Sequence, residues 1–265
     1  MKKIIVLIIT LTILLVCLVG CNKKDGVLDE AKAYEITSEI HSLDILISAA
    51  DFKIEHGDEI SVVSNLKYLS VYEKDGVLTI IDEGKNYNDS DAMLTLYVPN
   101  GTIFDDADIT VGAAKMTVDT LSANSLELKL GAGDVRIKSL NASSDADIKG
   151  GVGQITIAGG TLNDLTLEVG MGELNLTAAV LGDSDLKFGV GESNVTLIGS
   201  KDDYKVEIEK GLGSITVDGT TVTDFGSSGN GQNHIEIKGG VGAVNLNYKD
   251  VRADQDGQPS KFAVQ

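Results

Sequence analysis

Several residue types are scarce in this chain, and each shortage excludes a class of protein. The 265 residues include no Trp, two Pro, two Cys and three His. Two cysteines cannot build a disulfide-rich scaffold, and the wide separation of the three histidines argues against a histidine-based metal site. Lys and Arg (22) are outnumbered by Asp and Glu (40), which gives a formal charge of −18. An acidic chain without a basic stripe excludes nucleic acid as a main partner, and we expect neither a metal nor a cofactor.

The first twenty-one residues have the pattern of a secretory signal. Lys2 and Lys3 precede an apolar run over residues 4–18, and small residues follow, which predicts a signal peptide over residues 1–20. The ending Leu-Val-Gly-Cys resembles the lipobox of bacterial lipoproteins. This resemblance implies cleavage before Cys21 and acylation of its sulfur. The alternative is a plain transmembrane anchor with an incidental cysteine.

Lipidation of Cys21 would hold the chain on the outer side of a bacterial membrane, in the cell envelope. Cys17 lies inside the apolar run and leaves with the signal peptide, so no free thiol remains. Polar residues after Cys21 predict a tether over residues 21–34, followed by one domain over residues 35–249. Residues 250–265 have little apolar pattern, and we expect them to be disordered.

The domain repeats one block of sequence. An alternating apolar run leads to a turn of the form small-apolar-small, and a second alternating run follows; residues 126–137 and 165–176 are two copies. Alternation with period two predicts strands, and a spacing of 19 or 20 residues between turns predicts the coils of a solenoid. The expected fold class is therefore all-β, a parallel β-helix or β-solenoid. Residues 57–101 keep a strand pattern without the period, which predicts irregular N-terminal coils.

The same alternation predicts which side chains point inward. We expect Ala113, Val152 and Val241, the middle residues of three turns, to lie in the core with the apolar residues of the arms. The recurring glycines fit corners where the next coil comes close. A polar insertion over residues 223–233 widens the last interval and is expected to be a mobile loop.

Three segments of the chain together resemble a known family. They are residues 96–101 (Leu-Tyr-Val-Pro-Asn-Gly), the repeated Gly-x-Gly turns and residues 203–208 before Gly211. The sequence resembles the bacterial putative-adhesin, β-strand-repeat proteins of the cell envelope over residues 35–249. The resemblance implies a β-helical fold, a surface location and a role in adhesion or envelope stress. It implies no catalytic residue.

One face of the expected solenoid is a candidate for binding a surface protein or a glycan. Its outward residues on the second arm carry hydroxyl and amide groups: Thr117, Thr156, Asn175, Thr196, Thr216 and Asn245. The first arm carries charges instead, such as Asp108, Glu127 and Lys129. Threonine is also an ordinary exposed strand residue, so a purely structural row is the simpler interpretation.

The sequence predicts a non-enzymatic, lipid-anchored binding module. One alternative is an envelope polymer hydrolase that uses surface carboxylates, and another is a purely structural spacer. Motifs of the Gly-x-Ser-x-Gly or His-Glu-x-x-His type do not occur in the sequence.

Overall fold

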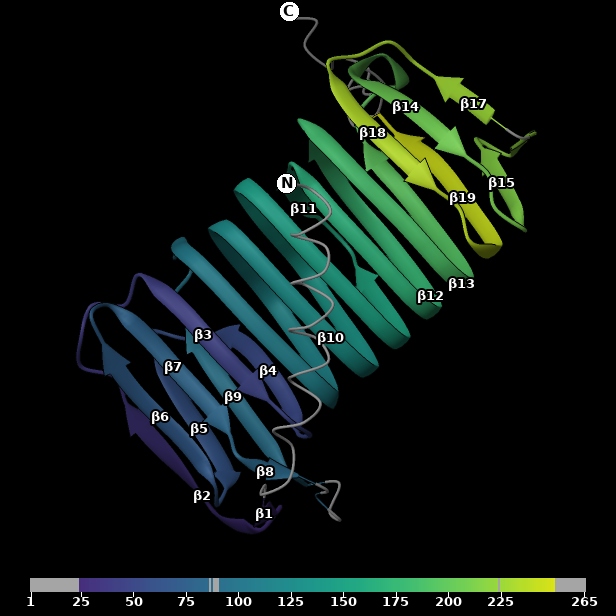
Figure 1. The fold of residues 1–265 in the computed structure, drawn as a ribbon. Coiled ribbons are helices and arrows are strands. Elements are labelled where there is room, and N and C mark those ends of the chain that lie inside the picture. Colours follow the sequence, from purple (N-terminus) through teal and green to yellow (C-terminus); the bar gives the residue numbers. More distant parts are fainter. Residues whose placement is uncertain (1–23, 86, 88–90, 224, 251–265) are drawn as a thin grey trace, which may run out of the picture.

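The computed structural model describes residues 24–85, 87, 91–223 and 225–250. The described chain consists of strands and one short 3-10 helix, so the all-β prediction is confirmed (Figure 1). Most strands join in one mixed, mainly parallel sheet that winds along the molecule. Cys21, the predicted signal peptide and residues 251–265 lie outside the described residues.

Three long strands and one short one form the central body. They are β10 (Phe104–Ile157), β11 (Gly160–Asn163), β12 (Leu165–Leu181) and β13 (Asp183–Ile198). β12 lies parallel to β10 on one side and to β13 on the other, with Ile148 paired to Leu167 and Leu167 to Leu186. Each of these partners is nineteen residues further along the chain, so the long strands follow the predicted repeat.

Coils of the central body have a third strand arm beside the two that the sequence predicts. In β10, residues 126–130 form a first arm and residues 135–137 a second arm. Residues 140–142 then pair with β11, and β11 pairs with the end of β12. Leu140 and Leu162 are completely buried there. The short arm escaped prediction because it is too brief to show a clear alternation.

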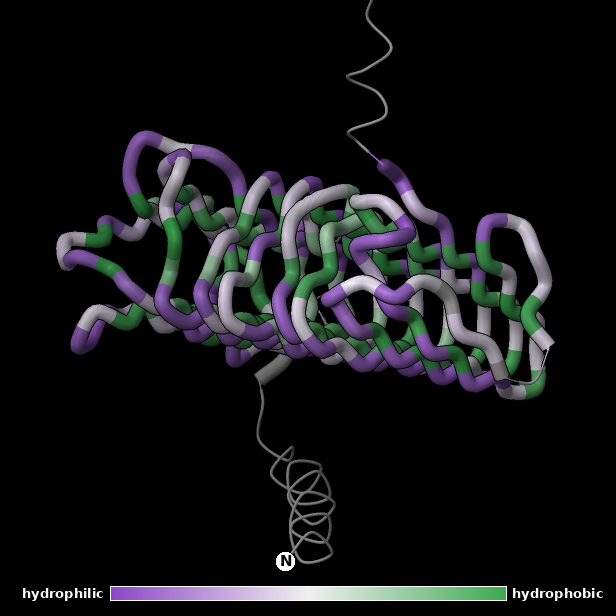
Figure 2. The backbone as a smooth tube through the Cα atoms, turned by 90° about the horizontal axis from the view of Figure 1, so that it is seen from above, coloured by the Kyte–Doolittle hydropathy of each residue, from purple (hydrophilic) through white to green (hydrophobic). Residues whose placement is uncertain are grey.

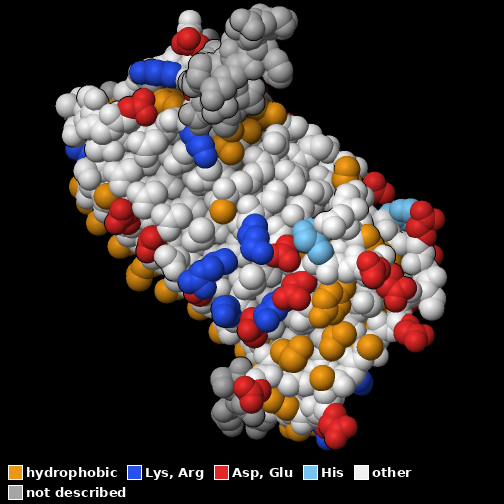
Figure 3. Space-filling model, turned by 180° about the vertical axis from the view of Figure 1, so that it is seen from behind, with side chains coloured by type: hydrophobic (Ala, Val, Ile, Leu, Met, Phe, Trp, Pro, Cys, Tyr) orange, Lys and Arg blue, Asp and Glu red, His pale blue; other side chains and the backbone are white. Residues whose placement is uncertain are grey.

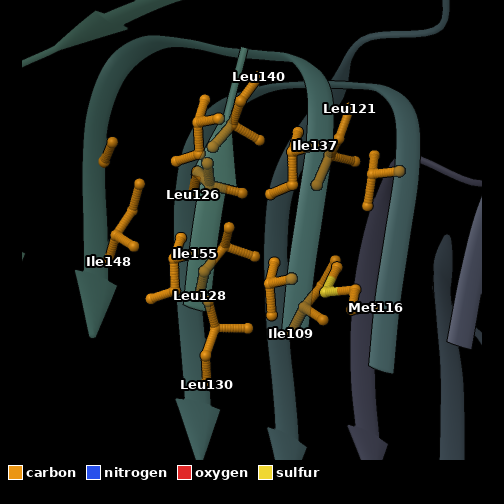
Figure 4. Close-up of a cluster of buried hydrophobic side chains, with 14 of the residues drawn as sticks. Ile109, Met116, Leu121, Leu126, Leu128, Leu130, Ile137, Leu140, Ile148 and Ile155 are labelled. Carbon is orange, nitrogen blue, oxygen red and sulfur yellow. The ribbon is translucent and has the colours of Figure 1, made fainter. Parts of the chain in front are cut away.

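The core lies between the arms and runs through the whole body. Figure 4 shows Leu126, Leu128 and Leu130 of one first arm pointing to the same interior as Ile137 and Ile155 of second arms. Hydrophobic and hydrophilic residues alternate along the tube (Figure 2), as strands with one buried face require. Burial of one such side chain contributes about 1.5–3 kcal/mol. Because neighbouring coils share this core, each coil depends on the next.

The second glycine of each Gly-x-Gly turn is required by close packing between coils. Gly172 has a φ of 135°, and a Cβ there would lie 1.9 Å from the carbonyl oxygen of Gly153. A residue with a Cβ would be strained in this backbone conformation and would have no room. The same contact, at 1.8–1.9 Å, recurs for five further glycines. They are Gly133, Gly153, Gly191, Gly242 and Gly213.

The middle residue of the turn points outward, so the prediction for Ala113, Val152 and Val241 is wrong. Ala113 is exposed, and Val152 and Val241 are 57% and 48% exposed. The prediction carried the alternation of the arms through the turn. At the turn the chain bends around a convex corner, and the residue at the apex of such a bend faces away from the core.

The C-terminal coils do not follow sequence order. β18 (Asn233–Lys238) and β19 (Val241–Lys249) both pair with β13. The earlier strands β14 (Tyr204–Glu209) and β15 (Ser214–Val217) pair with their outer side. The coil that comes last in the sequence therefore lies between β13 and the coil that precedes it in the chain. The 3-10 helix, η1 (Lys201–Asp203), leads into β14.

Antiparallel strands cover the exposed edge at this end. β17 (Phe225–Ser228) pairs with β14, and β16 (Thr220–Val222) pairs with β15. The expected loop over residues 223–233 thus contains a strand, which corrects the prediction. Uncovered strand edges can pair with other chains, and a short antiparallel strand interrupts the parallel stacking that would extend the solenoid.

The N-terminal end is built in the same way. β3 (Ser42–Ile47) and β4 (Asp51–His56) pair with β10 on one side, and with β7 (Val77–Asp82) and β9 (Met93–Val98) on the other. Three antiparallel strands then cover the end: β6 (Leu69–Lys74), β5 (Ser61–Leu66) and β2 (Leu28–Glu35).

The predicted tether is shorter than the sequence suggested. β2 (Leu28–Glu35) takes up half of the residues assigned to it, and β1 (Lys24–Asp25) pairs with β8 (Gly84–Lys85). Leu28 and Tyr34 pack against the core, which a tether would not do. Among the described residues, no helix has the length and apolar character needed to cross a membrane.

Candidate functional site

Most of the predicted Thr/Asn residues lie in one column across the second arms. Thr156 pairs with Asn175, and the column continues through Asn194 and Asn245 to Thr216. We call these five residues the Thr/Asn column. Thr117 lies on the second arm of its own coil, opposite Lys53 of β4. The coil-to-coil arrangement that the sequence predicts is therefore present.

Thr196 is outside this column, and Asn194 takes the place predicted for it. Thr196 pairs with Thr177 and Asn247, which form the next outward column. Alternation puts residues 194 and 196 on the same face, so it cannot decide between them. Counting could have done so, because every member of the column lies five residues after the first glycine of its turn, as Asn194 does after Gly189.

The amide groups of the column bond to one another from coil to coil. Asn194 Nδ2 donates to Asn175 Oδ1 at 3.0 Å, and Asn245 Nδ2 donates to Asn194 Oδ1 at 2.9 Å. At the end of the column, the Thr216 hydroxyl donates to Asn245 Oδ1 at 2.9 Å. Glu173 supports the start, since its Oε1 accepts from Asn175 Nδ2 at 2.7 Å. Such ladders hold neighbouring coils in register, at about 0.5–1.5 kcal/mol for each bond.

The ladder changes the role that the sequence suggests for these residues. An amide that already bonds within the column has less capacity left for a ligand, and the three Asn side chains are half-buried. The adjacent column of Thr177, Thr196 and Asn247 presents hydroxyl and amide groups beside it. Together the two columns form a flat, polar and regular surface over the second arms of β12, β13 and β19.

The first arms carry charged columns, as predicted. Asp185 pairs with Glu236 and Glu236 with Glu207, and Lys187 pairs with Lys238 in the column beside them. Ion pairs join the two columns within one arm, including Lys149 Nζ to Asp147 Oδ2 at 2.6 Å and Lys238 Nζ to Glu236 Oε1 at 2.9 Å. Exposed pairs of this kind contribute little to stability, and they neutralise part of the acidic face.

Two pKa shifts reflect these charged columns. Burial raises the pKa of Asp108, while Lys129 nearby opposes that rise. The hydrogen bond to Asp147 raises the pKa of Lys149, so this lysine stays charged at neutral pH. The carboxylates of the first arms therefore act mainly as partners of lysines.

Two cavities of the described chain lie toward the two ends of the solenoid. One of about 250 Å³ is lined by residues of β14–β17 and holds a single carboxylate, that of Asp218. The other, of about 240 Å³, lies at residues 98–104 and is lined by His56 without a carboxylate. Neither of these two cavities holds a pair of carboxylates, and no cluster of metal-ligating side chains occurs among the described residues.

These features define a stacked β-solenoid with an extended, regular surface. The sequence comparison agrees, because the model of the Toastrack DUF4097 family matches residues 40–247. The chain belongs to this family. Proteins with a curated functional description give no match.

Solved structures match most of the chain at low sequence identity. One described as a putative adhesin from Parabacteroides distasonis has a TM-score of 0.50 and 15% identity, and the alignment covers 83% of this chain and 98% of that one. A putative cell adhesion protein from Clostridium sporogenes has a TM-score of 0.37 and 14% identity over 83% and 99%. A protein from P. distasonis described as a putative lipid binding protein has a TM-score of 0.42 and 15% identity over 85% and 99%.

The family match confirms the resemblance that the sequence suggested. The chain is a β-rich member of the Toastrack DUF4097 family. At this identity the likeness concerns the fold.

Proposed function

We propose that the protein is a non-enzymatic, lipid-anchored binding module on the outer side of a bacterial membrane. One observation carries the proposal: the second arms present two parallel columns of hydroxyl and amide groups on a rigid, flat sheet. Stacked repeats commonly bind partners along such extended surfaces. Residues Thr177, Thr196 and Asn247 are the side chains that we expect to meet a surface protein or a glycan.

The regularity of the surface supports a repetitive ligand. Equivalent side chains recur from coil to coil at about 4.8 Å, the distance between paired strands. A glycan chain or an extended polypeptide can follow such spacing. The ladder of Asn175, Asn194 and Asn245 keeps the neighbouring column rigid, so a ligand loses less binding energy to ordering the surface.

Photo-crosslinking from the second arm tests the binding face. The crosslinking amino acid replaces Thr196 in the full chain displayed on intact cells, and Asp185, an exposed first-arm residue, is the matched control. We expect a discrete adduct from position 196 and none from position 185. Equal labelling at both positions, or none at either, would refute the binding face and favour a structural spacer.

Anchoring is tested separately at Cys21. We expect Cys21→Ala to abolish incorporation of labelled palmitate and to leave the precursor unprocessed. Unchanged processing together with unchanged membrane retention would contradict the lipoprotein assignment. Because this readout needs no ligand, it stays independent of the crosslinking result.

A further inference from the structure

The outward middle residues of the turns form a continuous apolar edge. Val152 pairs with Met171, Met171 with Val190, and Val190 with Val241. Leu212 follows beside Val241, since its neighbour Gly213 contacts the backbone of Gly242. We call these five residues the apolar edge. Figure 3 shows hydrophobic side chains in a row along one long edge of the molecule.

The side chains of this edge are open to solvent on the described chain. Val152, Met171, Val190 and Val241 are 47–57% exposed, and Leu212 is 86% exposed. The glycines on either side have no side chains to cover them. Five large apolar residues in register over four coil spacings span about 19 Å. A contiguous exposed patch of this kind marks a surface that another body covers.

The N-terminal end of the described chain lies at the end of the same edge. The turn Ser48–Ala50 precedes Ala113 in the stack, because Ala113 N donates to Ser48 O at 2.9 Å. Ser48 Oγ in turn donates to Asp82 O at 3.1 Å, and Asp51 N donates to Ala92 O at 2.8 Å. Asp82 and Ala92 therefore lie beyond that turn, and β8, the partner of β1, follows Asp82 closely in the chain (Figure 1).

Little chain separates this point from Cys21. Cys21 precedes Lys24 by three residues, which reach at most about 11 Å when fully extended. Acyl chains on Cys21 would thus bring the end of the edge to the bilayer surface. The large apolar residues begin further along, at Val152, and extend to Leu212 at the other end of the solenoid. A rod that lies on this edge would meet the bilayer at both ends.

One flank of the edge carries a mixed column of charges in which lysines outnumber carboxylates. The position three residues before the middle of the turn holds Glu168 and Glu209 in two coils. In four other coils it holds lysines, which are 42–47% exposed and ion-paired to a neighbouring carboxylate. They are Lys129, Lys149, Lys187 and Lys238. Lysines beside an apolar strip can reach lipid phosphates while the strip contacts the acyl boundary. Glu173 and Glu192 occupy the opposite flank, so the rod should tilt toward the lysines.

We propose that the apolar edge rests on the surface of the bilayer that holds the anchor, so that the solenoid lies along the membrane. This inference rests on the proposed lipidation of Cys21. A second copy of the chain is the competing occupant, and the net charge of −18 disfavours it by mutual repulsion. In the proposed orientation the polar columns of the second arms remain accessible to a partner.

A fluorescent label on the edge tests the orientation. The full chain carries Val190→Cys, labelled with an environment-sensitive dye, in phosphatidylcholine vesicles that contain quencher-bearing lipid. Cys17 is lost with the signal peptide and Cys21 is acylated, so the new thiol is the only reactive one. Ser144→Cys is the control, because Ser144 is exposed and follows the third arm at residues 140–142, which pairs with β11.

We expect lipid to quench the label at position 190 at least about twofold more than the label at position 144. In a chain labelled through Met171→Cys, the added changes Val190→Asp and Val241→Asp should remove the quenching. Equal quenching at positions 190 and 144 would overturn the inference. It would also be overturned if a second, quencher-labelled copy of the chain quenched the dye at position 190 while quencher-bearing lipid had no effect.

Labelled palmitate is measured on the same samples. Acylated chains with equal quenching refute the membrane orientation alone. Chains without acylation refute the proposed anchoring and, with it, this inference. The two failures are therefore distinguishable.

Discussion

The contact between stacked glycines makes Gly172→Ala the sharpest test of the coil packing. A Cβ at position 172 would lie 1.9 Å from the carbonyl oxygen of Gly153, and real Cβ atoms essentially never come closer than 3.0 Å. The two coils would have to separate locally by about 1 Å, or about a fifth of the 4.8 Å between paired strands. Hydrogen bonds at the corner would lengthen with that movement.

The expected loss of stability has two sources. Holding Ala at the φ of 135° seen for Gly172 costs about 1–3 kcal/mol, and forcing an extra methyl group into a packed site costs about 1–3 kcal/mol. Gly172→Ala should therefore destabilise the protein by about 2–6 kcal/mol, or lower the melting temperature by about 5–20 °C. Thermal unfolding followed by far-UV circular dichroism measures this.

Gly101→Ala separates the two sources. Gly101 also has a positive φ, 82°, but nothing lies within 4 Å of the position of its Cβ. It should show the conformational cost alone, about 1–2 kcal/mol. If Gly172→Ala were no more destabilising than Gly101→Ala, the steric argument would be wrong and the glycines would serve the turn conformation only.

Two further predictions concern the outward turn residues and the pH dependence of the N-terminal end. Val152→Asp should change the free energy of unfolding by no more than about 0.5 kcal/mol, because Val152 faces solvent. Leu167→Asp should lower the free energy of unfolding by several kcal/mol, because Leu167 is fully buried and the charge would have no partner. Equal urea midpoints for Val152→Asp and Leu167→Asp would contradict the outward placement of the turn residue. Hydrogen bonding by Ser38, through its side chain and its backbone, and by the Thr37 N–H holds the pKa of Glu73 below its ordinary value of 4.5. The contribution of these hydrogen bonds to stability should be complete above pH 4.5 and disappear as the pH falls through the lower folded pKa. Amide exchange at Thr37 and Ser38 checks this: loss of protection on acidification is expected in the unmodified protein and not in Glu73→Gln.

The position of Thr196 shows where sequence reasoning about the candidate site reached its limit. Alternation correctly placed the residues of the second arm on one outer face, because it depends only on the strand geometry of each residue. It could not say which outward residue of one coil stands beside which residue of the next. The paired strands decide that, and they put Asn194 in the column. The hydrogen-bonded ladder of amides follows from this register.

The turns show a second limit. The glycines identified the corners correctly, since a repeated Gly-x-Gly marks a backbone that needs positive φ and close approach. The direction of the residue between them depends on how the corner bends in space. Val152 and Val241 look like core residues by composition and by alternation, yet the convex bend turns them outward.

The sequence by itself determined the class of this protein. The all-β content, the repeat of about nineteen residues and the apolar positions of the arms are local or periodic properties, so they can be read along the chain. Only the tertiary structure decided the order of the coils at both ends, where residues 233–249 lie inside residues 204–217 and residues 42–56 lie inside β7 and β9. It alone placed the antiparallel strands that close those ends and lined up the exposed turn residues as one edge. These features depend on pairing between segments far apart in the sequence, which no local pattern encodes.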